Sequence, residues 1–72
     1  MPKILSSKEV VSILLREGFI FISQKGSHAK FRKKVMGEAI TVIVPMSKNE
    51  IPAGTLRSII RQSRLLRELF LT

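Results

Sequence analysis

The chain has no cysteine and no aspartate, and His28 is its single histidine among 72 residues. Without cysteine it can form neither a disulfide framework nor a thiolate metal site, which favours a cytoplasmic protein over a small secreted one. Without aspartate and cysteine it cannot build a Ser-His-Asp or a Cys-His catalytic arrangement. One histidine and five scattered glutamates are too few for a metal site, so no metal and no other cofactor is expected.

Long hydrophobic runs are also missing. No segment approaches the roughly 20 apolar residues needed to span a bilayer, and the amino terminus shows no signal-peptide pattern. So short a chain has room for one domain, residues 1–72, with two or three layers around one small core. The sequence therefore predicts one small domain that does not associate with membranes.

Positive charge is abundant instead. Thirteen Lys and Arg against five Glu give a net charge of +8 and a pI near 11.0. This excess favours a polyanionic partner, namely RNA, DNA or an acidic protein. The alternative is a surface that is merely basic and well solvated, without a specific partner.

Periodic apolar residues predict two helices. In the first, over residues 6–17, Ser6 and Glu9 have the spacing of a capping box, and Gly18 supplies a left-handed cap at the end. The second helix begins near Ile51-Pro52 and continues to Ser63. The hydrophobic tail beyond it either extends this helix or forms a further short turn.

Three strands are predicted between the helices. Residues 19–23 are aromatic and β-branched, which is typical of a buried strand, and residues 28–35 and 39–45 alternate with a period of two. The element order α-β-β-β-α predicts an α+β fold with both helices on one face of a three-stranded antiparallel sheet. Phe21, Phe31 and Val42 are candidates for the core. The opposite, open face would carry His28, Lys30, Arg32 and Lys34.

The segment 24–34 contains His28 and five of the thirteen cations. Histidine readily takes or gives a proton near neutral pH, and among cations that bind phosphate it could deprotonate the 2′-hydroxyl of RNA or protonate a leaving oxygen. RNA carries its own nucleophile, so such cleavage needs no cofactor. For the second acid–base group, Lys25, Ser27, Lys30, a water molecule and the same imidazole acting twice all remain open. A lone histidine is more often structural or merely exposed.

Two glycine-containing dipeptides, Gly26-Ser27 and Gly54-Thr55, each have a structural and a functional interpretation. Gly26-Ser27 is an ordinary turn between strands, and at the same time it places His28 at the start of the next strand. Gly54 and Thr55 at a helix start would allow a phosphate to approach free backbone N–H groups, yet a plain helix start explains them equally well.

The segments "GFIFISQKGSHAKFR" and "ITVIVPMSKNEIPAGTLRSIIRQS" together resemble the HicA family of small messenger-RNA interferase toxins. The chain departs from the family pattern after Gln62, where Ser63-Arg64-Leu65 replaces the usual Ala-Gly-Leu. The residues that carry the resemblance are Gly18, Phe19, Gly26, Ser27, His28, Ile51, Pro52, Gly54, Thr55, Leu56, Ile59 and Gln62.

The resemblance implies a fold like the double-stranded-RNA-binding domain, an endoribonuclease with His28 as its catalytic residue, and a HicB-like antitoxin that masks the site. The expected partners are thus messenger RNA and this antitoxin. One alternative is a non-catalytic RNA-binding module of the same fold, and another is a degraded relative that retains only protein binding. The predicted RNA contacts are Lys25, Gly26, Ser27, Lys30, Arg32, Lys48, Gly54 and Thr55.

Overall fold

Helix α1 (Ser7–Arg16) begins and ends at the signals that the sequence contains. The Ser6 hydroxyl accepts the Glu9 N–H at 3.1 Å, and the Glu9 carboxylate accepts the Ser6 N–H at 2.9 Å, so the capping box is complete. Beyond the helix, Gly18 has a φ of 95°, a conformation that favours glycine. The predicted start and left-handed stop of this helix are therefore confirmed.

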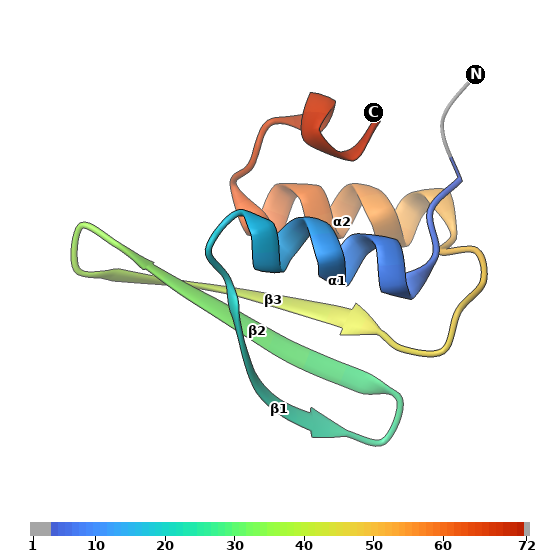
Figure 1. Cartoon of the computed structure of the whole chain (residues 1–72), viewed down its shortest axis with the longest axis horizontal. Coiled ribbons are helices and arrows are strands. Elements are labelled where there is room, and N and C mark those ends of the chain that lie inside the picture. The colour runs from blue at the N-terminus through green and yellow to red at the C-terminus, as the bar shows by residue number, and fades with distance from the viewer. Residues whose placement is uncertain (1–3, 72) are drawn as a thin grey trace.

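The computed structural model describes residues 4–71 (Figure 1). After α1 come three antiparallel strands in the order β1-β2-β3, then a second helix and a short 3₁₀ helix. The predicted α+β class and the order α-β-β-β-α are confirmed. The remaining bounds are β1 (Ile20–Lys25), β2 (His28–Val35), β3 (Glu38–Pro45), α2 (Ala53–Ser63) and η1 (Arg67–Phe70).

Both hairpins turn on two residues with the backbone conformations that such turns demand. Gly26 has a φ of 59° in the β1–β2 turn, whereas Met36 and Gly37 have φ values of 54° and 81° in the β2–β3 turn. Two successive positive φ values are the mark of a type I′ turn, whose twist matches that of the strands. The short turns place β1, β2 and β3 side by side in chain order.

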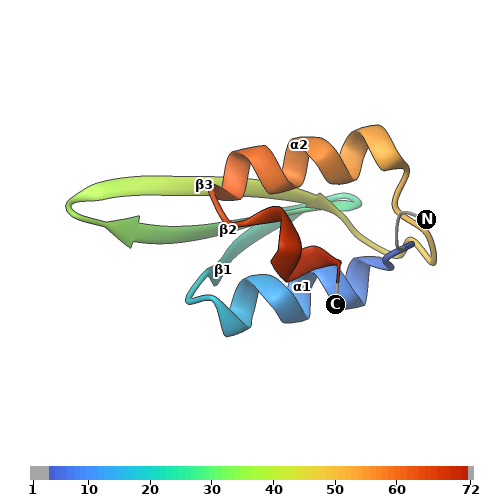
Figure 2. The same cartoon turned by 90° about the horizontal axis from the view of Figure 1, so that it is seen from above.

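Both helices lie on one face of the sheet, as predicted (Figure 2). Alternate residues of β2 and β3 point toward them, including Ala29, Phe31 and Val42. The opposite face is not covered by either helix. The buried core comprises Leu5, Val10, Ile13, Leu14, Phe19, Ala29, Phe31, Ile40, Val42, Val44, Ile51, Leu56, Ile59 and Phe70.

The expected burial of the first strand is wrong. Every residue of β1 is exposed, and Phe21, a predicted core residue, is 54% exposed. The helices contact the sheet chiefly at β3, and β1 curves away beneath them (Figure 1). Phe21 therefore keeps only an edge-on contact with Phe31, at 5.8 Å between ring centroids. The buried aromatic of this segment is Phe19, which precedes the strand.

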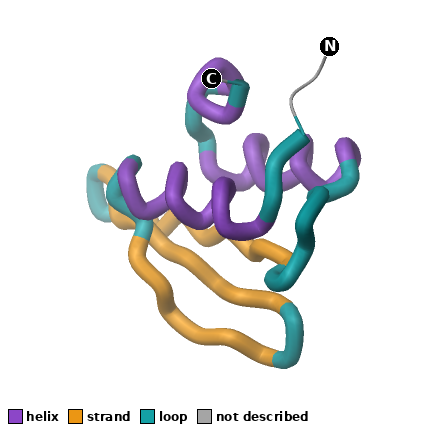
Figure 3. Tube along the Cα trace, turned by 45° about the vertical axis from the view of Figure 1, so that its right-hand side comes forward, coloured by secondary structure: helices purple, strands orange, loops and turns teal. Residues whose placement is uncertain are grey.

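The carboxyl-terminal tail forms a short turn and does not extend α2. Helix α2 ends at Ser63, and Arg64 takes a left-handed conformation with a φ of 58°, the position at which helices usually carry glycine. Helix η1 then runs along the side of the helices away from the sheet (Figure 3), with Phe70 fully buried. The Arg64 guanidinium lies 2.6 Å from the Glu38 carboxylate and lowers the pKa of Glu38 through this hydrogen bond and its charge.

The helices among residues 4–71 are too short or too polar for any of them to cross a membrane.

Candidate catalytic groove and basic face

A row of cations lies on the open face of the sheet. Ala29 and Phe31 of β2 are buried beneath the helices, so the residues between and beyond them point the other way. Lys25 of β1 pairs with His28 of β2 and belongs to the same face. We call this surface, formed by Lys25, His28, Lys30, Arg32 and Lys34, the basic face.

The cations of the basic face lack carboxylate partners within residues 4–71, where the structure places a single ion pair, between Arg64 and Glu38. Arg32 donates from Nε to the Thr41 hydroxyl at 3.2 Å, which orients the guanidinium without neutralising it. Lys33 points to the helix face instead, where its Nζ donates to the Glu17 carbonyl at 2.7 Å. Four of the five cations of segment 24–34 therefore remain available to an anionic partner.

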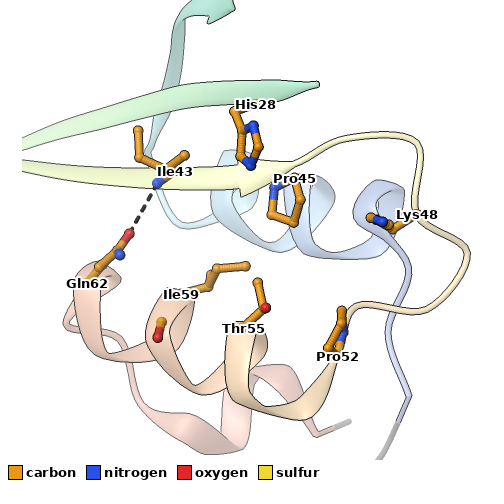
Figure 4. A pocket seen from close by; sticks show the side chains of 9 residues that line it. His28, Ile43, Pro45, Lys48, Pro52, Thr55, Ile59 and Gln62 are labelled. Carbon is orange, nitrogen blue, oxygen red and sulfur yellow. Dashed lines mark hydrogen bonds between the residues drawn. The ribbon is translucent and has the colours of Figure 1, made fainter. Parts of the chain in front are cut away.

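A groove opens where α2 passes along the free edge of β3 (Figure 4). It has a volume of about 340 Å³, and we call it the edge groove. His28 and Ile43 reach it from the sheet, while Thr55, Ile59 and Gln62 face them from α2. The lining residues are His28, Ile43, Pro45, Lys48, Pro52, Thr55, Ser58, Ile59 and Gln62.

Hydrogen bonds from Ser7 hold the loop that carries Lys48. The Ser7 hydroxyl donates to the Pro45 carbonyl at 2.6 Å and accepts the Lys48 N–H at 3.0 Å. The Ser7 N–H donates to the Lys48 carbonyl at 2.9 Å, and the Met46 N–H donates to the Ser27 carbonyl at 2.6 Å. The loop is thus attached both to α1 and to the turn beside His28.

The side chain of Gln62 closes the helix side of the groove. Its Oε1 accepts the Ile43 N–H at 3.1 Å. This backbone group lies on the free edge of β3, so the contact joins the end of α2 to the sheet. Hydrogen bonds therefore hold the groove lining in two places, at Pro45 and Lys48 through Ser7 and at Ile43 through Gln62.

The structure brings together His28, Lys48 and Thr55, which the sequence places far apart. Lys25, Lys30 and Arg32 lie next to them on the basic face. The other three predicted contacts lie outside the groove lining: Gly26 and Ser27 form the exposed turn before His28, and Gly54 is exposed in the first turn of α2.

The groove lining also contains residues that were not among the predicted RNA contacts, namely Ile43, Pro45, Pro52, Ser58, Ile59 and Gln62. Ile43 and Pro45 alternate with buried β3 residues, so the strand pattern alone places them on the open face with His28. Ser58 and Gln62 are one helical turn apart, and Gln62 is also one of the residues that resemble the HicA pattern, as are Pro52 and Ile59. The sequence thus indicates each of these residues separately, but only the packing of α2 against β3 shows that they line one groove.

A second, larger groove of about 1080 Å³ lies along α2, the amino-terminal segment and η1. None of the predicted catalytic or RNA-contacting residues lines it, and the chemistry that the sequence indicates lies at the edge groove. No three acidic or histidine side chains gather as a metal site would require anywhere in residues 4–71.

The model of a family described as the HicA toxin of bacterial toxin–antitoxin systems matches residues 7–65. The chain belongs to the HicA toxin family. The matched region runs from the start of α1 to just beyond α2 and includes every residue that lines the edge groove. A search of curated proteins found no match. The sequence resemblance is thereby confirmed, and the protein is a toxin of a bacterial toxin–antitoxin pair.

Replacing Ser7 with alanine should destabilise this HicA toxin by about 1–3 kcal/mol, because the Pro45 carbonyl and the Lys48 N–H each lose their partner. Urea unfolding measures the loss, and amide hydrogen exchange at Lys48 should become faster. Ser12→Ala, at an exposed position of the same helix, is the matched control. Equal stability of the two variants would contradict the assigned role of the Ser7 hydroxyl.

Proposed function

We propose that this HicA toxin is a single-domain endoribonuclease, residues 1–72, that cleaves messenger RNA in the cytoplasm with His28 as its catalytic residue. A HicB-like antitoxin would neutralise it by covering the same site. The observation that carries the proposal is the position of His28, which is exposed where the basic face meets the edge groove.

The basic face would hold the phosphates of RNA on one side of His28. Lys25, Lys30 and Arg32 have the charge for this purpose and no carboxylate partner among the described residues. Lys48 lines the groove together with His28. It would place a further positive charge near the phosphate at which negative charge develops during cleavage.

The proposed reaction is an internal transfer at phosphorus. The imidazole of His28 accepts the proton of the 2′-hydroxyl, the 2′ oxygen forms a bond to the adjacent phosphorus, and the bond from phosphorus to the 5′ oxygen breaks. The leaving oxygen takes a proton from the imidazolium or from water. The products are a 2′,3′-cyclic phosphate and a 5′-hydroxyl, and the proton count balances with one histidine.

A non-catalytic RNA-binding role is the second candidate, because the unneutralised basic face would bind phosphates whether or not a bond is broken. The two functions differ in what His28 does. In the first it transfers a proton, and in the second it is one more surface residue.

His28→Ala should lower the rate of cleavage of a long single-stranded RNA by roughly 10²–10⁴-fold, the usual contribution of acid–base catalysis. The assay contains a metal chelator, and the ends are analysed for 2′,3′-cyclic phosphate. A substrate of the same sequence made of DNA should remain intact because it lacks the nucleophile. If neither the parent nor the variant cleaves, although both bind RNA tightly, the binding-module function replaces the nuclease.

Replacing Lys30 and Arg32 with alanine should weaken RNA binding at every sequence. The slope of log affinity against log salt should become shallower by about 0.7 for each phosphate of the single strand that is no longer neutralised. The double variant Lys8→Ala and Arg16→Ala removes the same two charges from the exposed side of α1 and should leave the slope nearly unchanged. An unaltered slope in the Lys30 and Arg32 double variant would remove the basic face from the RNA interface.

A cognate HicB-like antitoxin, added at a concentration equal to that of the toxin, should stop cleavage and protect His28. Protection is measured by the rate of diethylpyrocarbonate modification of the imidazole with and without the antitoxin. Inhibition with His28 still fully reactive would show that the antitoxin acts from another surface. That surface would then have to be sought away from the basic face.

A further inference from the structure

The edge groove combines an apolar interior with very little charge. Ile43, Pro45, Pro52 and Ile59 supply its apolar wall, and Lys48 is its one lysine or arginine. Its volume of about 340 Å³ falls within the range of about 300–1,000 Å³ that is usual for small-ligand sites. A phosphate would bind better on the basic face, whereas a flat, largely apolar ring with polar edges suits this groove.

The hydrogen bond with the Ile43 N–H determines the orientation of the Gln62 amide. The Ile43 N–H is a donor, so the Gln62 atom that meets it at 3.1 Å must be the carbonyl oxygen Oε1. The two N–H groups of Nε2 have no partner among residues 4–71. The groove thereby presents a fixed hydrogen-bond donor, while the hydroxyls of Thr55 and Ser58 can rotate to donate or accept.

We propose that the edge groove binds one nucleobase of single-stranded RNA beside the phosphate held at His28, and that Nε2 of Gln62 recognises the edge of that base. This inference rests on the proposed ribonuclease function and adds to it the recognition of one base beside the cleaved bond. His28 lines the same groove, so a base seated there brings its own ribose and phosphate next to the imidazole.

The groove selects against duplexes for a physical reason. A base in a helix is stacked and its pairing edge is occupied, whereas an unstacked base can enter a pocket and offer that edge to a side chain. An amide that only donates favours base edges with acceptors. The enzyme should therefore prefer unpaired RNA, with a bias at the nucleotide next to the cut.

The test compares Gln62→Glu with the parent on a randomised single-stranded RNA whose cleaved ends are sequenced. Glutamate keeps an oxygen for the Ile43 N–H and exchanges the free donors for an acceptor. The preference at the bound base should shift by roughly tenfold toward bases with an amino group, with an unchanged unfolding temperature. Ser12→Glu adds the same charge to an exposed position on α1, away from both the groove and the basic face, and should leave the preference unaltered.

A second variant separates base recognition from support of the strand. Gln62→Met removes both the free donors and the cap on Ile43, so it should lose preference and unfold at a lower temperature. If Gln62→Glu has the parental preference and only Gln62→Met is impaired, Gln62 is a structural cap and the proposal is wrong. Equal cleavage of a duplex of the same sequence would overturn it as well.

Failure of the nuclease function is distinguishable from failure of this inference. If the parent cleaves nothing, the same variants are compared by their affinity for short RNAs that differ in one base. A base preference that shifts in Gln62→Glu would support the groove without catalysis. Equal affinity for all bases in parent and variant would overturn the inference independently of His28.

Discussion

The buried hydroxyl of Ser7 is the contact on which the arrangement of the site depends. It satisfies a carbonyl at the end of β3 and an N–H of the following loop, which are 38 and 41 residues away in the chain. Ser7 is only 3% exposed, so its hydroxyl depends on these protein partners, and leaving them unpaired would be costly. The two bonded groups lie on either side of Ser47, which has a positive φ of 63°. The positions of Pro45 and Lys48, two of the residues that line the edge groove, are held by this one side chain.

Side chains of β2 point alternately to the two faces of the sheet, and this places most of its cations on the open face. The helix face takes Ala29 and Phe31, and the open face takes cations. Lys33 is a cation that points to the helix face instead. Its ammonium donates to the Glu17 carbonyl at the end of α1 and lies near the ring of Phe19. A net charge of +8 on 72 residues opposes compaction through self-repulsion. Binding of a polyanion would relieve that repulsion and stabilise the bound state.

Most elements could be predicted because their signals are local. The capping box of α1, the glycine after it and the alternation of β2 depend on residues within a few positions of one another. The exposure of Phe21 could not be predicted, because it depends on how far the helices extend over β1. Arg64 illustrates a similar limit, since a long side chain stands where glycine is usual, and its ion-pair partner Glu38 is 26 residues away in the chain.

The sequence singles out the residues of the candidate site but does not predict the shape of the site. His28 stands out by composition, and its neighbouring cations by sequence. The groove, however, arises from the contact of α2 with the edge of β3, and the amide of Gln62 that seals this contact is 19 residues from its partner.

The hydrogen bond between Gln62 and Ile43 also prevents the edge of β3 from pairing with another strand at Ile43, a hazard of exposed edges. The edge that is closed in this way gains a pocket, whereas β1, the opposite edge, retains an exposed apolar surface at Ile20 and Phe21. In the proposed function, recognition of a base and protection of the sheet edge would both use Gln62, a polar side chain at the end of an otherwise apolar contact.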